Sequence, residues 1–189
     1  PSLPNTETRR HAAVQALLQF QAAVPVEGLP VLGADHLQAE LDLFPVWCVQ
    51  RAFGRAWGAD EQALWARVSA RLVDSAQAQP RIALRSGSPA ADLGAVPEGP
   101  AVVAGPITGD IAALLRDDGV ADDEAAELDL AVRWWDGARR SGLPVDPDFG
   151  EFWRALEWMG LQRQLMRLGR ICRDRAAGDA PDDAAHAAT

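Results

Sequence analysis

The segment ALRSGSPAADLG, residues 83–94, places small polar residues and an acid between two apolar stretches, so it is the first place to look for chemistry. Ser86 and Ser88 carry hydroxyls that could act as nucleophiles if a histidine lay close enough to take their protons. The chain has only His11, His36 and His186, of which two fall on predicted helices and one in the tail. The sequence therefore does not favour a Ser-His-Asp site.

The same segment also lacks the features of a phosphate-binding loop. It has no G-K-[ST] sequence, and all 18 basic residues of the chain are arginines, so no lysine can contact nucleotide phosphates. Asp92 and Glu98 offer oxygen ligands of the kind that magnesium binds. Glutamate is one methylene longer than aspartate, which displaces a metal that requires octahedral geometry. We therefore favour two solvated loop acids over a metal site.

Length, charge and hydropathy narrow the class of protein. The 189 residues are 48% hydrophobic, enough for one core, so we expect a single domain or one lobe of a larger fold. A net charge of −9 disfavours nucleic acid and anionic membranes as partners, since both require a basic surface. No apolar run approaches the about 20 residues of a membrane span. We expect a soluble, cytoplasmic protein, and the start at Pro1 indicates a fragment or a processed product.

The two cysteines, Cys48 and Cys172, lie far apart and form no C-x-x-C pair. This spacing argues against a disulfide framework or a zinc site and suits a reducing cytoplasm. We expect both side chains to be small buried hydrophobic groups.

Hydrophobic periodicity predicts helices over residues 7–23, 33–45, 60–78, 105–119, 122–141 and 148–173. Pro45 should kink or end the second helix, Thr108 or Asp110 should cap the fourth, and Gly142 should follow the end of the fifth. The predicted buried stripes are Val14, Leu17, Leu18 and Gln21; Leu37, Leu41 and Phe44; Leu64, Val68 and Leu72; Leu128, Val132 and Trp135; Phe149, Phe152, Leu156 and Met159; and Leu161, Leu165, Leu168 and Cys172.

The region between residues 80 and 107 is rich in proline and glycine, and its only strand-like pieces are 81–84 and 101–104. We therefore predict a mainly α (α+β) fold with at most one small hairpin near 81–104. Residues 1–175 form the folded unit, and residues 176–189 form a disordered, acidic and alanine-rich tail.

Three segments carry a family resemblance, namely ELDLFPVWCVQR, GPITGDIAALLRDD and GLPVDPDFGEFWRALEWMGLQRQLMRLGRICR. Together they resemble, in order, the carboxy-terminal lobe of the bacterial aminoglycoside phosphotransferase-like family. The resemblance is nearest to the anomeric sugar kinases that phosphorylate N-acetylmuramate and N-acetylglucosamine in cell-wall recycling. It spans residues 7–175 and implies the helical lobe of a protein-kinase-like fold.

The resemblance implies that an intact member uses ATP and Mg²⁺, with a lysine on a separate amino-terminal lobe that is absent from this sequence. In the helical lobe, an H-[RG]-D-x-x-x-x-N loop supplies an aspartate that orients the acceptor hydroxyl and an asparagine that holds magnesium. Aligned on this pattern, Arg85, Ser86 and Gly87 stand at H-R-D, Asp92 at the asparagine, and Glu98 near the later metal-binding aspartate. Gly87 has no side chain to accept a proton, so the chain cannot use the family's mechanism.

Two explanations for this loop remain open. Either the chain is a degenerate kinase-like module that binds or regulates without catalysing, or residues 83–104 derive from a frame-shifted or damaged gene. A shifted frame in GC-rich DNA encodes mainly Ala, Gly, Pro, Arg and Ser, which dominate this segment. A purely structural helical domain is a third possibility.

The resemblance also assigns candidate positions around the acceptor site. It places Gln162, Arg163 and Trp158 where an amino sugar or its carboxylate would bind, although an ion pair of Arg163 with Glu157 is an equally good interpretation. Asp110 matches an aspartate that braces the catalytic loop and does not itself react. We expect the seven tryptophans to be core or groove-lining residues: Trp47, Trp57, Trp65, Trp134, Trp135, Trp153 and Trp158.

Overall fold

The computed structural model describes residues 6–85, 101–117 and 123–178. Two of its helical segments, η1 and η3, are wound more widely than an α-helix. In chain order the elements are α1 (Thr6–Ala23), α2 (Ala34–Leu43), η1 (Phe44–Ala52), α3 (Ala59–Gln77), β1 (Arg81–Arg85), β2 (Val102–Pro106), α4 (Gly109–Ala112), η3 (Ala113–Asp117), α5 (Glu124–Arg140) and α6 (Phe149–Gly178). The predicted mainly α fold with one small hairpin is confirmed.

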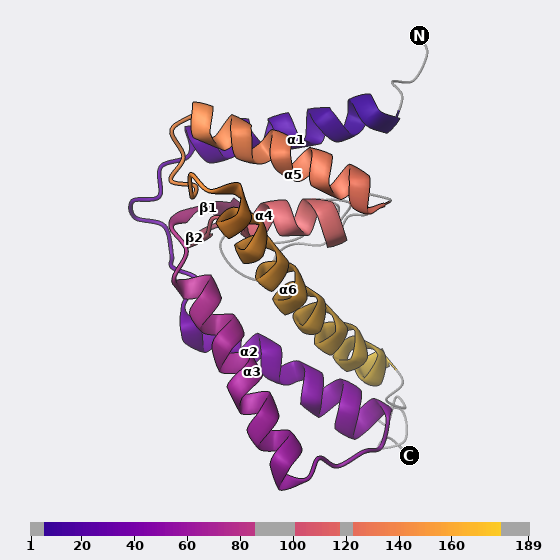
Figure 1. Cartoon of the computed structure of the whole chain (residues 1–189). Helices are drawn as coiled ribbons and strands as arrows, with labels where there is room; N and C mark the ends of the chain where they lie inside the picture. The colour runs from indigo at the N-terminus through magenta and orange to yellow at the C-terminus, as the bar shows by residue number, and fades with distance from the viewer. Residues whose placement is uncertain (1–5, 86–100, 118–122, 179–189) are drawn as a thin grey trace, which may run out of the picture.

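The helices form two groups that are joined by the long helix α6 (Figure 1). Helices α1 and α5 lie side by side next to the hairpin and α4, whereas α2 and α3 lie together at the other end. Helix α6 begins beside α4 and runs diagonally to the second group, where it packs against α2, α3 and η1. A single helix therefore contacts both groups.

The hairpin pairs β1 and β2 in antiparallel register, with Arg81 opposite Pro106 and Arg85 opposite Val102. A two-stranded hairpin is marginal by itself in water. Here it gains a third chain segment, because the backbone around Val31 bridges Ala104 in parallel. Leu32 donates its N–H to the carbonyl of Ala104 at 2.8 Å, an interaction that the proline-rich sequence of this segment did not predict.

The core confirms three of the predicted stripes. All four residues of the α1 stripe are buried, and so are Leu37 and Leu41 of α2 and Phe152, Leu156 and Met159 of α6. Phe44 and Phe149, which complete the last two stripes, are half-buried. Trp134 is fully buried and stacks on Phe152 with ring centroids 5.4 Å apart. The other six tryptophans are half-buried.

The predicted stripe of α5 is wrong. Leu128 and Val132 are 44% and 40% exposed, and the helix instead buries a face that includes Ala131, Trp134 and Gly137. At Gly137 a Cβ would overlap the side chain of Leu18, so the small residue lets α1 and α5 approach closely. Both faces of α5 are apolar, but the face with the small residues and the indole of Trp134 is buried because it allows closer packing against α1.

The second stripe of α6 and the start of the α3 stripe were also wrong. Leu161 and Leu168 of α6 are about half exposed, as is Leu64 of α3. Helix α6 buries Gln162 and Gly169 there. As in α5, packing against neighbouring helices determines which face of the helix is buried, and this face differs from the one that the hydrophobic pattern predicts.

Some of the predicted helix ends are confirmed by the structure, and others differ from it. Helix α2 ends at Leu43, as Pro45 predicted, although the chain continues helically in η1. Gly142, with φ +73°, follows the end of α5 as predicted. Thr108 is the N-cap residue of α4, but neither its side chain nor that of Asp110 forms a capping hydrogen bond, because both side chains bind other segments. Helix α6 continues to Gly178, past residue 175, and residues 179–189 lie outside the described residues.

The expectation for the cysteines is corrected by the structure. Cys48 and Cys172 form a disulfide that joins η1 to α6, with Cα atoms 5.4 Å apart. Because the two cysteines are 124 positions apart, their spacing in the sequence did not predict this pairing. The packing of η1 against α6 brings them together.

Candidate functional site

Asp110, near the start of α4, binds the end of strand β1. Its side chain is buried, and its Oδ2 accepts a hydrogen bond from the backbone N–H of Arg85 at 3.1 Å. Arg85 is the last residue of β1. The carboxylate therefore holds the chain at the point where it leaves the hairpin toward residue 86.

The surroundings of Asp110 act on its ionisation in opposite directions. Burial raises the pKa of Asp110 to about 6, because the charged form loses its hydration. The backbone hydrogen bond from Arg85, the guanidinium charges of Arg163 and Arg85, and the amide of Gln21 each lower the pKa of this carboxyl. These groups stabilise an otherwise costly buried charge near neutral pH.

Gln21 is a part of this site that the sequence analysis did not single out. It is buried in α1, and its Oε1 accepts a hydrogen bond from the indole N–H of Trp134 at 3.1 Å. Its Nε2 has no hydrogen-bond partner among the described residues, but the amide is close enough to Asp110 to lower the pKa of that carboxyl. The available signal was a polar residue at the last position of the apolar α1 stripe, where a buried amide needs partners.

Arg85 is held by α1 as well as by Asp110. Its guanidinium lies over the ring of Phe20, 4.7 Å from the ring centroid. We call the contact between Asp110 and Arg85 the Asp110 anchor. Phe20 and Gln21 are neighbours in α1, so one turn of this helix lies beside both residues of the anchor. The anchor thus joins α1, β1 and α4.

The three predicted substrate residues lie on neighbouring turns of α6, and their role in binding an amino sugar stays a prediction. Gln162 is buried, and its Nε2 has no hydrogen-bond partner among the described residues. Arg163 lies near enough to Asp110 to lower the pKa of that carboxyl, and it makes further contacts. Trp158 lines a separate pocket. The ion pair considered for Glu157 forms with Arg116, at 2.6 Å.

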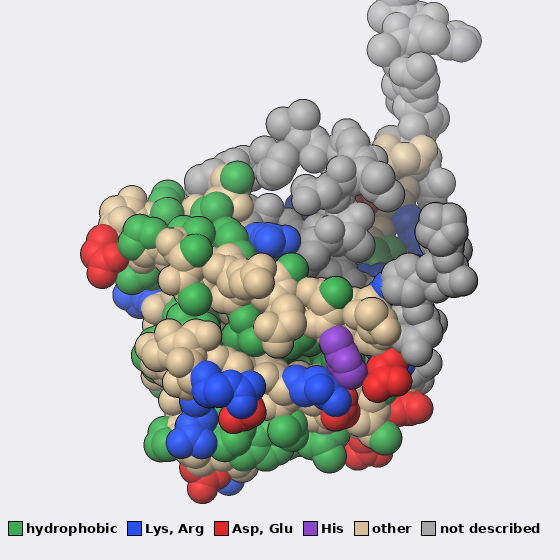
Figure 2. All heavy atoms as spheres, turned by 90° about the horizontal axis from the view of Figure 1, so that it is seen from above, with side chains coloured by type: hydrophobic (Ala, Val, Ile, Leu, Met, Phe, Trp, Pro, Cys, Tyr) green, Lys and Arg blue, Asp and Glu red, His purple; other side chains and the backbone are tan. Residues whose placement is uncertain are grey.

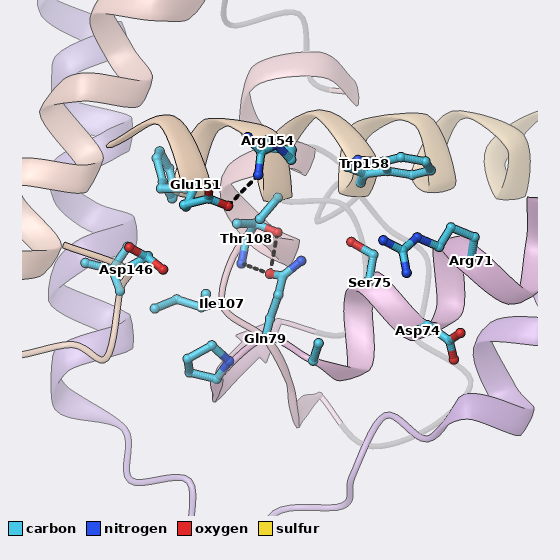
Figure 3. Close-up of a pocket in the computed structure, with 15 residues that line it drawn as sticks. Arg71, Asp74, Ser75, Gln79, Ile107, Thr108, Asp146, Glu151, Arg154 and Trp158 are labelled. Atoms are coloured by element: carbon cyan, nitrogen blue, oxygen red, sulfur yellow. Dashed lines mark hydrogen bonds and ion pairs between the residues drawn. The ribbon is translucent and has the colours of Figure 1, made fainter. Parts of the chain in front are cut away.

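That pocket has a volume of about 530 Å³ and lies between the carboxy-terminal end of α3 and the amino-terminal half of α6. Figure 3 shows Arg71, Ser75 and Gln79 on one side and Trp158 on the other. The amide Oε1 of Gln79 accepts two hydrogen bonds from Thr108, one from its backbone N–H at 3.2 Å and one from its hydroxyl at 2.7 Å. The pocket is therefore built on a fixed polar contact.

The loop predictions cannot be compared with the structure. Ser86, Gly87, Ser88, Asp92 and Glu98 lie outside the described residues. Within the described ranges, no group of three or more His, Cys, Asp or Glu side chains could hold a metal ion. The metal assignments therefore stay predictions.

The charged surface and the helices bear on the expected partners. On the face shown in Figure 2, arginines lie beside acids and form no continuous basic stripe among the coloured residues. The described surface includes paired charges such as Arg133 with Asp129, at 2.7 Å. Of the helices that the structure describes, none is long and apolar enough to cross a membrane.

Comparison with known proteins supports the resemblance, although no protein-family model matches the chain. Over 167 residues it is 34% identical to the N-acetylmuramate/N-acetylglucosamine kinase of Neisseria meningitidis serogroup B, covering 85% of this chain and 50% of that protein. The kinases of the same name from Pseudomonas putida and Pseudomonas aeruginosa are 35% and 32% identical, over 89% and 94% of this chain. By sequence, the chain is a relative of these sugar kinases.

The chain spans about half the length of the curated kinases that it matches, 50% to 56%. The match extends over 85% to 94% of this chain. The predicted relationship to the sugar kinases and the helical architecture of this part are thus confirmed.

Proposed function

We propose that this chain is a kinase-like lobe of the sugar kinase type that binds an amino sugar but does not phosphorylate it. One observation carries the proposal. The buried carboxylate of Asp110 holds the backbone of Arg85, yet the next two residues are Ser86 and Gly87. The chain keeps a support for a catalytic loop and lacks the side chain that such a loop would present.

The chemistry of phosphoryl transfer explains why this loss matters. Transfer from Mg-ATP requires a group that orients the acceptor hydroxyl, oxygen ligands that place the metal, and cations that neutralise the phosphates. Glycine offers no side chain at position 87, and the sequence contains no lysine. Asp92 and Glu98 are the remaining candidates for metal ligands. ATP and Mg²⁺ are therefore cofactors that we assign to an intact relative.

Asp110 acts in this proposal as a positioning residue, and Arg163 as the residue that meets the acceptor. The charge of Arg163 acts on the buried carboxylate of Asp110, and a guanidinium is a group that suits a carboxylate or a hydroxyl of a sugar. We assign Gln162, which is buried on the adjacent position of α6, a supporting role. A separate amino-terminal lobe is the expected protein partner, and the cytoplasm the expected compartment.

The test combines a turnover assay with a binding assay. The chain is incubated with Mg-ATP and either N-acetylglucosamine or N-acetylmuramate, and ADP release and sugar phosphate are measured. We expect neither product, but saturable sugar binding by calorimetry that weakens at least tenfold in Arg163→Gln. Arg167→Gln, an exposed change one turn along α6, is the matched control and should bind normally. Sugar phosphate above the background of a no-enzyme control would show an active enzyme.

The composition of residues 83–104 favours a second candidate, a damaged reading of an active sugar kinase. Resequencing the coding DNA through residues 80–107 and upstream of Pro1 tests it. A one-base shift that restores H-R-D-x-x-x-x-N, with an upstream lobe carrying a lysine, would assign the catalytic function of the relatives. An intact frame would leave the non-catalytic proposal standing.

A further inference from the structure

The pocket between α3 and α6 lies at the end of the hairpin that faces away from the Asp110 anchor. Thr108 binds Gln79, which precedes β1, whereas Asp110 binds Arg85 at the other end of the same strand. A five-residue strand spans about 13 Å between its first and last residues. The pocket is therefore separate from the place where the chain leaves the hairpin.

One side of the pocket is a polar stripe formed by Arg71, Ser75 and Gln79, which face Trp158 of α6 (Figure 3). Arg71 and Ser75 are four residues apart and lie on one face of α3, and Gln79 follows two residues after the last residue of that helix. Within the described part of the chain, the guanidinium of Arg71 and the hydroxyl of Ser75 have no hydrogen bond or ion pair. Both groups are available to a ligand.

Gln79 adds a donor whose direction is fixed. Because its Oε1 accepts both hydrogen bonds from Thr108, its Nε2 cannot take that position without facing two donors. This Nε2 is buried and has no partner among the described residues. In Figure 3 the amide nitrogen points toward the middle of the pocket. A buried donor without a partner indicates a missing acceptor.

Three acids also line the pocket, namely Asp74, Asp146 and Glu151. Glu151 pairs with Arg154 at 2.6 Å, and Asp146 lies at the end of the pocket away from Arg71 (Figure 3). Asp74 is exposed, and in Figure 3 it lies on the side of α3 away from Trp158. Among the described residues, none of these acids forms an ion pair with Arg71.

We propose that this pocket binds a small organic carboxylate with a flat apolar body. The carboxylate would accept hydrogen bonds from Arg71, Ser75 and Gln79, and the body would lie against Trp158. Guanidinium groups bind carboxylates with two parallel hydrogen bonds, and indole rings pack on flat groups. The volume of about 530 Å³ falls in the range of small-molecule sites. This site goes beyond the proposed function, which concerns the other end of the hairpin.

The experiment uses benzoate as the probe and the full chain labelled with 5-fluorotryptophan. The ¹⁹F resonance of Trp158 is assigned with Trp158→Phe. We expect benzoate to shift this resonance saturably at millimolar concentration, and benzyl alcohol to bind at least tenfold more weakly. Arg71→Gln should weaken benzoate binding at least tenfold and Ser75→Ala severalfold. Arg67→Gln, one turn earlier on α3 and not lining the pocket, should bind like the parent.

Four results would overturn the proposal, provided that the variants melt like the parent chain. These are no saturable shift, equal binding of benzoate and benzyl alcohol, equal binding of inorganic phosphate and benzoate, and unchanged binding by Arg71→Gln. None of these readouts involves ATP or an amino sugar. The failure of this proposal and that of the proposed function are therefore distinguishable.

Discussion

The carboxylate of Asp110 holds the backbone N–H of Arg85 across 25 residues of sequence, while Thr108, two residues away, holds Gln79. Both ends of β1 are thus fixed by side chains from the same short segment. A strand of a two-stranded sheet has little support of its own, so these contacts determine where the chain leaves the hairpin. This support is present whichever residues come after Arg85.

The free energy of unfolding should depend on pH through the ionisation of Asp110. Its pKa of about 6 lies above the ordinary value of 3.8, so the native state binds a proton that the unfolded state releases. This difference in proton binding stabilises the native state. The contribution to the free energy of unfolding is on the order of 3 kcal/mol; it is fully present below about pH 4 and is lost as the pH rises through 6. Asp110→Asn removes this titration. Urea unfolding at pH 4 and pH 7 should show the parent losing stability relative to the variant.

The control for this prediction is Asp60→Asn, an exposed change at the start of α3. Its stability difference from the parent should change much less between the two pH values. A pH-independent difference between the parent and Asp110→Asn would show that Asp110 does not titrate in this range.

Gln21 should matter for stability, because its amide satisfies the indole N–H of buried Trp134. Gln21→Leu leaves that donor unpaired in the core, and we expect a loss of about 1–3 kcal/mol in the free energy of unfolding. It also removes a group that lowers the pKa of Asp110, so this pKa should rise further. Gln15→Leu, exposed on the same helix, serves as the comparison in urea unfolding. Equal effects of the two changes would contradict the assigned role.

The disulfide between Cys48 and Cys172 closes a long loop, because the two cysteines are 124 positions apart in sequence. Such a crosslink restricts the unfolded chain, and its loss typically costs about 2–5 kcal/mol. Reduction should therefore lower the urea midpoint of the parent chain but not that of the double variant Cys48→Ser, Cys172→Ser. Alkylation of both thiols in the unreduced, unfolded protein would show that the bond does not form.

Gly160 makes room for an ion-pair junction. Arg116 pairs with both Glu127 and Glu157 at 2.6 Å, and a Cβ at position 160 would overlap its guanidinium. Alanine favours helix by about 1 kcal/mol over glycine, yet Gly160→Ala should destabilise by about 1 kcal/mol or more because Arg116 is displaced.

A double-mutant cycle checks the cause of this effect. In an Arg116→Ala background, Gly160→Ala should become neutral or stabilising. Gly178→Ala, where a Cβ meets open space, should cost nothing in either background. If Gly160→Ala has the same cost with and without the arginine, the clash lies elsewhere.

The sequence identified the elements better than it identified their faces. Periodicity located the α1 stripe and most of the first α6 stripe, whose residues are buried. It failed for α5, where Leu128 lies on one apolar face and Trp134 on another. Two faces of similar hydrophobicity differ in how closely a neighbouring helix can approach, and that depends on contacts between distant segments.

The candidate site also combines features that the sequence predicts with contacts that it does not predict. The residue types available at each position of the candidate loop can be read from the sequence alone, because a side chain that is absent from a position cannot be supplied by folding. The sequence also determined the relationship to sugar kinases, through motifs in a fixed order. It did not show that Arg163 lies near Asp110 while Trp158 lines another pocket, nor that Cys48 meets Cys172. Those pairings depend on how α6 crosses the other helices, and only the tertiary structure decided them.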